Sequence, residues 1–168
     1  MGDSGEQMPN RSDNESVAKL LQKIADILEF TNENPFKFRS YQMAAETIGS
    51  MGTPVSDIAA RGGAAELQKI PGIGKTISAQ ILEIVETGRS SYFDELTKNV
   101  PATVLDLRRV SGIGLKTAQL LYRDYAVDSL EQLRSFVESG ELARIPGLGE
   151  KTTARIVSSL NRLSKEAS

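Results

Sequence analysis

The chain of 168 residues contains no cysteine and no histidine. The absence of cysteine excludes a disulfide framework and a thiolate metal site, and the absence of histidine removes the usual general base and the commonest metal ligand. Aromatic residues are scarce, and no apolar run is long enough to span a membrane. The polar, acidic amino terminus lacks the basic and apolar regions of a signal peptide. These absences predict a cytoplasmic protein without a histidine-based hydrolase site.

Charge is distributed unevenly along the chain. The 22 acidic residues outnumber the 20 basic ones, for a net charge of −2. Residues 1–34 alone hold seven acidic and three basic side chains, so the remaining residues carry a net charge of +2. Positive charge gathers further in the carboxy-terminal part, at Arg144, Lys151, Arg155, Arg162 and Lys165. This distribution predicts modest, salt-sensitive affinity for a polyanion, whereas the acidic total favours a protein-interaction module.

Three internal repeats, at residues 67–81, 107–121 and 142–156, organise the chain. In each repeat two apolar residues three apart end a helical face, a Pro or Ser stops it, and Gly-Ile-Gly or Gly-Leu-Gly follows. The glycines allow a tight turn and the close approach of another backbone. A small residue four positions past the last glycine, and an aliphatic one seven past it, predict a second helix that crosses the first closely. Each repeat therefore predicts a helix-hairpin-helix unit.

The turn of such a unit predicts phosphate binding. The second helix begins with backbone N–H groups that have no helical partner and that point outward with the positive end of the helix dipole. A lysine and a threonine follow the glycines in every copy, placed to add a charge and a hydroxyl to the same phosphate oxygens. The predicted DNA-binding residues are Gly72, Gly74, Lys75, Thr76, Gly112, Gly114, Lys116, Thr117, Gly147, Gly149, Lys151 and Thr152. Such contacts read the DNA backbone rather than the bases.

Other glycine-rich motifs fit this sequence less well. A Walker A loop that includes Gly74 needs a further glycine five positions earlier, where the chain has Lys69. A dinucleotide-binding fingerprint needs a third glycine at Ile77 and a preceding strand. The remaining alternative is that the hairpins only pack. Three copies, each with a nearby Lys and Thr, favour nucleic-acid binding over packing alone.

Every predicted element is helical, so the predicted fold class is all-α with tandem helix-hairpin-helix subdomains. Residues 1–15 are polar and are predicted to form a disordered tail. Helices are predicted over 17–30, 36–50 and 55–60, and Gly62 and Gly63 separate the last of these from the first repeat. Short helices are also predicted over 91–98 and 130–138. The expected domains are 16–90, with the first hairpin, and 91–168, with the other two.

From Asn34 onward the chain resembles the amino-terminal region of family X DNA polymerases, most closely the bacterial members. The resemblance rests on Asn34-Pro-Phe-Lys-Phe-Arg-Ser-Tyr-Gln-Met-Ala-Ala45, Ile70-Pro-Gly-Ile-Gly74 running to Glu86-Thr-Gly88, Arg109-Val-Ser-Gly-Ile-Gly114, Ser129-Leu-Glu-Gln-Leu133 and Ile145-Pro-Gly-Leu-Gly149. It covers about four-fifths of the chain. It implies a lyase-like four-helix domain that grips the downstream 5′-phosphate side of a DNA gap, followed by a helical subdomain on the other side of the break.

Several site residues follow from this resemblance alone. Lys37 and Tyr41 match the family's 5′-phosphate pocket, although a core tyrosine beside a solvated lysine would give the same pattern. The family's hairpins also bind Na⁺ or K⁺ through backbone carbonyls. The corresponding positions are Gln68, Ile70, Ile73, Arg108, Val110 and Ile113. No other cofactor is expected.

Two departures from the family pattern determine the expected activity. Gln80 replaces the lysine that forms a Schiff base in the family's 5′-deoxyribose-phosphate lyases, and Thr76 replaces a supporting lysine. In the family the polymerase palm would follow the third repeat, but this sequence ends at Ser168. We therefore expect no nucleotidyl transfer from these 168 residues, whether they are a stand-alone protein or a fragment. The predicted function is non-sequence-specific binding of gapped or nicked DNA in repair, with DNA and a repair protein as partners. The alternatives are a lyase that uses Lys75 or Lys37, and a protein-interaction module.

Overall fold

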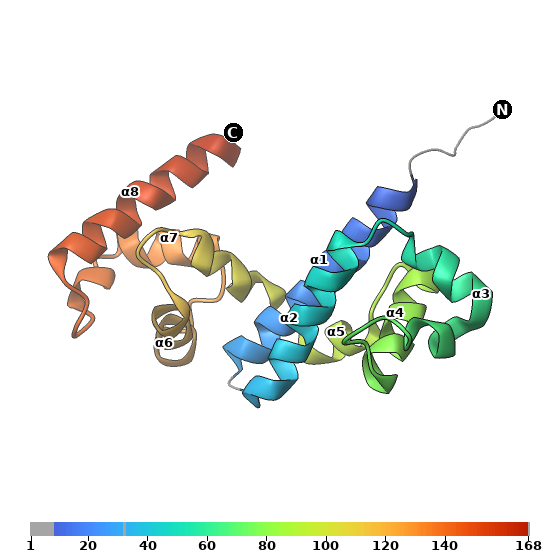
Figure 1. Cartoon of the computed structure of the whole chain (residues 1–168). Coiled ribbons are helices and arrows are strands. Elements are labelled where there is room, and N and C mark those ends of the chain that lie inside the picture. Colours follow the sequence, from blue (N-terminus) through green and yellow to red (C-terminus); the bar gives the residue numbers. More distant parts are fainter. Residues whose placement is uncertain (1–8, 32, 168) are drawn as a thin grey trace. The chain divides into compact units, whose positions relative to one another are not determined.

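The computed structural model describes residues 9–31 and 33–167, and within these ranges the regular elements are helices, with no strand. The predicted all-α class is confirmed. The chain divides into two compact units, Met1–Lys98 and Asn99–Ser168. Figure 1 traces the helices of each unit along the sequence. No helix in the described ranges is long and apolar enough to cross a membrane.

The first unit is built on two long helices, α1 (Pro9–Phe30) and α2 (Pro35–Ser50), which pack along each other (Figure 1). The Asn34 side chain caps α2 by accepting a hydrogen bond from the Phe36 amide at 2.9 Å. Pro35 stands in the first turn, where an N–H would have no helical partner. The first hairpin joins α3 (Val55–Leu67) to α4 (Lys75–Thr87). α3 is kinked at Gly62 and Gly63, where the sequence predicted a break.

Aliphatic side chains from these four helices fill the core of the first unit. The largest fully buried ones are Leu21, Ile24 and Leu28 of α1, Ile48 of α2, Leu67 of α3 and Ile81 of α4. Burying each such side chain contributes roughly 1.5–3 kcal/mol. Leu67 and Ile81 belong to the first repeat, so the apolar positions that define the hairpin in the sequence are the ones that anchor it in the core.

α1 begins earlier than the sequence predicted. Residues 9–15, expected to belong to a disordered tail, are helical, while residues 1–8 of that expected tail lie outside the described residues. Asn14 explains the difference, because it is only 4% exposed and its side chain bonds across to the start of α3. Its amide donates to the Thr53 carbonyl at 2.9 Å, and its oxygen accepts from the Val55 amide at 2.8 Å. These bonds link residues about 40 positions apart, so composition did not reveal them.

A short helix, α5 (Ser91–Leu96), completes the first unit. Its Tyr92, Phe93 and Leu96 side chains pack against the core of the first unit, and the helix contacts α1. The boundary between the two compact units lies between Lys98 and Asn99, eight residues after the predicted domain boundary. The partly buried apolar side chains of α5 pack against the core of the helices that precede it, which places α5 in the first unit.

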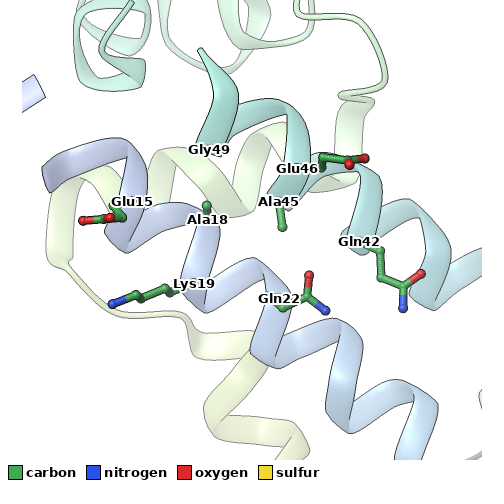
Figure 2. Close-up of a pocket in the computed structure, with 8 residues that line it drawn as sticks. All are labelled: Glu15, Ala18, Lys19, Gln22, Gln42, Ala45, Glu46 and Gly49. Carbon is green, nitrogen blue, oxygen red and sulfur yellow. The ribbon is translucent and has the colours of Figure 1, made fainter. Parts of the chain in front are cut away.

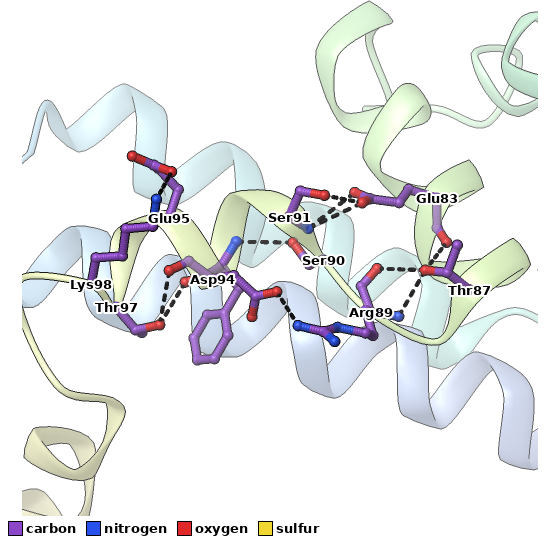
Figure 3. A network of polar contacts seen from close by, with 10 residues as sticks. Glu83, Thr87, Arg89, Ser90, Ser91, Asp94, Glu95, Thr97 and Lys98 are labelled. Carbon is purple, nitrogen blue, oxygen red and sulfur yellow. Dashed lines mark hydrogen bonds and ion pairs between the residues drawn. The ribbon is translucent and has the colours of Figure 1, made fainter.

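Polar contacts hold the corner between α4 and α5 (Figure 3). α4 ends at Gly88, which adopts the left-handed conformation with φ 77°. The Glu83 carboxylate accepts hydrogen bonds from the amide and the hydroxyl of Ser91, at the positive end of α5. Arg89 forms an ion pair with Asp94 at 2.7 Å. These contacts connect the end of the first hairpin to α5.

The second unit carries the other two hairpins. The second hairpin joins the 3₁₀ helix η2 (Ala102–Arg109) to α6 (Leu115–Tyr125), and the third joins η3 (Leu142–Arg144) to α8 (Glu150–Ala167). Between them lies α7 (Leu130–Glu138), which contacts η2, η3 and α8. Repeat positions again supply fully buried side chains, namely Leu107, Leu121, Leu142 and Ile156, together with Leu133 of α7.

Candidate nucleic-acid interface

The three hairpin turns share one backbone conformation. The first glycine of each turn is left-handed, with φ values of 85°, 99° and 85° at Gly72, Gly112 and Gly147. The second glycine precedes the helix in an extended conformation, at φ −92° and ψ −168° for Gly74 and φ −94° and ψ −169° for Gly114. Only glycine adopts the first of these conformations without strain, which explains the repeated Gly-x-Gly.

Each turn presents amides that the following helix does not use. The first amide with a helical partner belongs to Ser78 in the first hairpin, which donates to the Gly74 carbonyl at 2.9 Å. Ala118 and Thr153 make the same bond in the other two hairpins, at 2.9 and 3.0 Å. Gly74 and Gly114 have no side chain with which to cap α4 and α6. The amides of the first helical turn are therefore free, within the described chain, to bind an anion.

A cavity of about 500 Å³ lies beside the first hairpin. It is lined by Lys37, Ser40, Tyr41, Gly72, Gly74, Lys75, Thr76 and Ile77. We call it the hairpin pocket. It brings together six sequence-predicted residues, four from the first turn and two from the expected phosphate pocket on α2. Ser40 and Ile77 also line the hairpin pocket but were not predicted, since a lone serine and an aliphatic helix residue carry no distinctive signal.

The hairpin pocket has a positive rim. Lys37 is about half exposed, and its ammonium lies 3.9 Å from the Glu33 carboxylate and 5.7 Å from the centre of the Tyr92 ring. The pKa of Lys37 is raised, chiefly by the neighbouring Tyr92 hydroxyl and also by Glu33, so Lys37 is a cation at neutral pH. A cation over an aromatic face is held in place without losing its exposure to an anionic ligand.

Tyr41 belongs to both the core and the hairpin pocket. It is 3% exposed, and its ring stacks on Tyr92 with 5.9 Å between ring centres. Its hydroxyl accepts a hydrogen bond from the Gln80 side-chain amide at 2.8 Å. Burial raises the pKa of Tyr41, and the bond from Gln80 opposes this to a smaller extent. Gln80 and Tyr92 were not predicted to meet Tyr41, because they lie 39 and 51 residues away in the sequence.

The second hairpin differs from the first in what surrounds its turn. A Cβ atom added at Gly112 would lie 3.0 Å from Ile156 Cγ1 and 3.4 Å from the Thr152 carbonyl oxygen, both on α8. The Ser111 amide beside it donates to the hydroxyl of buried Ser159 at 2.8 Å. Gly112 therefore makes room for α8 of its own unit, in line with the expectation that these glycines allow another backbone to approach closely.

The remaining predicted glycines meet no such neighbour. A Cβ atom at Gly114, Gly147 or Gly149 would have no heavy atom within 4 Å in the described part of the chain. Lys116 and Lys151 are exposed, and Thr117 and Thr152 are partly buried. The third turn has an acidic residue, Glu150, at the start of α8. Its charge opposes a phosphate at the same helix end.

The backbone carbonyls predicted to hold a monovalent cation lie at the first two turns. The Ile70 carbonyl accepts from the Ile73 amide at 3.0 Å, and the Val110 carbonyl accepts from the Ile113 amide at 3.1 Å. A carbonyl oxygen has two lone pairs, so each keeps one for a cation. The other predicted carbonyls are those of Gln68 and Ile73 in the first hairpin and of Arg108 and Ile113 in the second. No cluster of acidic side chains that could hold a metal ion occurs among the described residues.

A second hollow, of about 550 Å³, lies between α1 and α2 (Figure 2). Small residues form part of its wall, and a Cβ atom at Gly49 would lie 3.5 Å from the Ala18 Cβ. Its charged residues are Glu15, Lys19 and Glu46, so its net charge is negative. This groove therefore does not favour a phosphate, in contrast to the hairpin pocket.

Comparison with known families agrees with this geometry. Residues 12–90 match the helix-hairpin-helix domain, and residues 104–162 match the SAM-like helix-hairpin-helix tandem. The first match lies within the first unit and the second within the second unit. The chain is thus a tandem helix-hairpin-helix protein.

Its relatives include DNA polymerases. The chain is 27% identical over 150 residues to the DNA polymerase/3′-5′ exonuclease PolX of Bacillus subtilis, covering 89% of this chain and 25% of that protein. It is 30% identical over 118 residues to DNA polymerase lambda of Rattus norvegicus, covering 68% of this chain and 19% of that protein. The resemblance to the amino-terminal region of family X polymerases is confirmed.

A further relative is RuvA of Leptothrix cholodnii, a subunit of the Holliday junction branch migration complex. The identity is 30% over 88 residues, covering 52% of this chain and 46% of that protein. The chain thus spans less than half the length of each of these relatives.

Proposed function

We propose that this chain binds DNA through the sugar-phosphate backbone, and that the hairpin pocket takes the 5′-phosphate at a gap or nick. The observation that carries the proposal is the pocket itself, in which the glycine turn of the first hairpin meets Lys37 and Tyr41 of α2. Amides at a helix start, an ammonium group and a phenol hydroxyl are all donors suited to phosphate oxygens. The helix-hairpin-helix domains and the polymerase and RuvA relatives support DNA as the ligand.

An exposed aromatic side chain favours a gap over intact duplex. Phe36, next to Lys37 at the start of α2, is 80% exposed. An exposed aromatic ring binds nucleic acid best by stacking on an unpaired base, which intact duplex does not offer. A phosphate site and a stacking surface on adjacent residues therefore fit the end of a strand beside unpaired template.

The other hairpins extend the proposed interface along the backbone. The free amides of α6 and α8 and the exposed Lys116 and Lys151 would hold further phosphates without reading sequence. A Na⁺ or K⁺ ion held by the predicted carbonyls of the first and second hairpins would add positive charge at those two turns. We also propose that the chain acts in the repair of broken DNA in the cytoplasm and that a repair protein is its second partner.

Lyase activity is the second candidate, and one observation favours it. Lys75 lines the hairpin pocket together with Lys37 and Tyr41, so an amine does lie beside the proposed phosphate site. Against it, the imine-forming position holds Gln80, whose amide is bonded to Tyr41. Lys37 has a raised pKa, the opposite of what an amine nucleophile needs. Borohydride trapping on a 5′-deoxyribose-phosphate gap separates the two functions, because an adduct lost in Lys75→Ala would establish the lyase.

The binding proposal is tested with a one-nucleotide gapped duplex that carries either a 5′-phosphate or a 5′-hydroxyl. Fluorescence anisotropy should show tighter binding to the phosphorylated gap, by about tenfold for one charge-assisted contact at a half-exposed lysine. Lys37→Ala should remove most of this preference, while Lys23→Ala on α1 should leave it unchanged. The preference should stay constant from about pH 7 to 9, since the pKa values of Lys37 and Tyr41 both lie above their usual ones. Equal affinity for the two gaps would contradict the proposal, and salt-independent affinity would favour a protein-interaction module.

A further inference from the structure

Gln80 lies on α4 just outside the hairpin pocket, yet it is bonded to a residue that lines it. The pocket is lined by Tyr41 but not by Gln80. The Gln80 amide donates to the Tyr41 hydroxyl at 2.8 Å, across 39 residues of sequence. Gln80 can therefore act on a ligand in the pocket through Tyr41.

The bond from Gln80 determines which hydrogen-bonding group of the Tyr41 hydroxyl remains available to a ligand. A phenol hydroxyl has one hydrogen to donate and lone pairs with which to accept. Because Gln80 donates to the oxygen, the hydroxyl hydrogen of Tyr41 is not used by Gln80 and is available to an acceptor on the pocket side. Tyr41 is 3% exposed and stacked on Tyr92, so the ring itself is fixed and the donor direction depends on the bonds at its oxygen.

The arrangement of Gln80 is unfavourable for packing alone. Its Oε1 atom is buried and has no hydrogen-bond partner among the described residues. A buried acceptor without a partner destabilises the fold, whereas a methionine of similar size would fill the same space without that cost. The side chain at this position is thus better explained by its amide donor than by its fit.

We propose that Gln80 is a positioning residue that directs the Tyr41 hydroxyl hydrogen toward a 5′-phosphate in the hairpin pocket. This inference rests on the proposed function. Substituting Gln80 should change the preference for a 5′-phosphate over a 5′-hydroxyl, and it should do so only while Tyr41 has a hydroxyl. A residue that merely supports the fold would weaken binding of both DNAs equally and would not change their ratio.

The test measures the ratio of the two dissociation constants, together with Tm, for Gln80→Met, Gln80→Glu, Tyr41→Phe and the double variant Gln80→Met/Tyr41→Phe. Gln80→Met should change Tm little, because removing the unpartnered acceptor offsets the loss of the bond to Tyr41, yet it should lower the ratio about threefold. Gln80→Glu should lower the ratio further, because its carboxylate would accept the Tyr41 hydroxyl hydrogen and so withdraw it from the phosphate. The double variant should match Tyr41→Phe alone. Gln22→Met on α1 is the matched control and should leave the ratio unchanged.

The possible failures are distinguishable. If the parent protein and Tyr41→Phe differ in the ratio but Gln80→Met equals the parent, the role of Gln80 is wrong and the phosphate pocket stands. If Gln80→Met lowers the ratio as much in the Tyr41→Phe background as in the parent, Gln80 acts without Tyr41 and the inference is also wrong. A parent protein that shows no preference for the 5′-phosphate would overturn the proposed function and this role with it.

Discussion

The first and second hairpins have the same turn in different surroundings. Gly74 and Gly114 differ by no more than 2° in φ and 1° in ψ, and both precede a helix whose first amides lack helical partners. Yet a Cβ atom at Gly72 would meet nothing within 4 Å of the described chain, whereas one at Gly112 would lie 3.0 Å from Ile156. The first turn borders the hairpin pocket and the second is packed against α8.

This difference shows what the Gly-x-Gly motif specifies. The motif fixes a backbone shape, and the same shape borders an open cavity in one hairpin and packs closely against a helix in another. In the second unit the third hairpin's helix α8 fills the space beside the second turn and bonds the Ser111 amide through Ser159. The same three residues therefore have open space around them in one copy and a packed helix beside them in the next.

The largest expected effect is a difference in the free energy of unfolding between substitutions at Gly112 and at Gly72. Gly72→Ala should cost about 1–2 kcal/mol, because a side chain is strained at positive φ. Gly112→Ala should cost about 1–3 kcal/mol more, because its Cβ also meets Ile156 and the Thr152 carbonyl. Urea unfolding followed by circular dichroism measures both losses in the full chain. Equal losses would show that α8 does not pack against the second turn as described.

The next largest expected effect is on the affinity of the first hairpin turn for DNA rather than on stability. Gly74 has an extended conformation and open space around it, so Gly74→Val should leave the fold nearly unchanged. A valine there should hold phosphate away from the α4 amides and weaken binding to gapped DNA about tenfold, or ~1.4 kcal/mol. Lys75→Ala should have a smaller effect.

Gly52 provides the matched control for this substitution. It also has no neighbour within 4 Å of an added Cβ in the described residues, but it lies between α2 and α3, away from the hairpin. Gly52→Val should bind gapped DNA like the parent in a fluorescence titration. If Gly74→Val binds as tightly as Gly52→Val, the amides of the first turn are not part of the interface.

The smallest effect concerns the ends of the two hairpin helices. α4 ends at Gly88 and α6 ends at Ala126, and both residues are left-handed, with φ 77° and 58°. Ala126→Gly should stabilise the second unit by about 0.5–1 kcal/mol, the relief of strain less the greater freedom of glycine in the unfolded chain. Gly88→Ala should destabilise the first unit by a comparable amount. Thermal unfolding checks both, and an unchanged or lower Tm for Ala126→Gly would contradict the strain.

The repeats explain why much of the fold was predictable. Leu67 and Ile81, or Leu107 and Leu121, are apolar at spacings that only a close helix pair satisfies, so local pattern predicted each hairpin. Contacts between distant residues were not accessible in this way. Asn14 anchors α1 to Val55, and Gln80 reaches Tyr41, through single polar side chains whose partners lie about 40 residues away. Polar residues of this kind look like surface residues until the fold brings their partners to them.

For the candidate site, the sequence predicted the individual residues but not how they come together. The glycines, Lys75 and Thr76 follow from the motif, and Lys37 and Tyr41 from a resemblance, but their meeting in one pocket depends on how α2 packs in the first unit. The different role of Gly112 depends on α8, which begins 38 residues later. A repeated motif predicts a repeated backbone, whereas the neighbours of each copy come from the rest of the chain.

The place of α5 in the first unit has a consequence for the order of folding during synthesis. α1 is the first helix of this unit to leave the ribosome, and α5, which packs against it, follows about 60 residues later. Until then the surface that Tyr92, Phe93 and Leu96 will cover stays exposed on the nascent chain. The second unit begins only after α5, at Asn99, so the first can close before the helices of the second leave the ribosome. The short helix thus acts as the closing step of one folding event before the next begins.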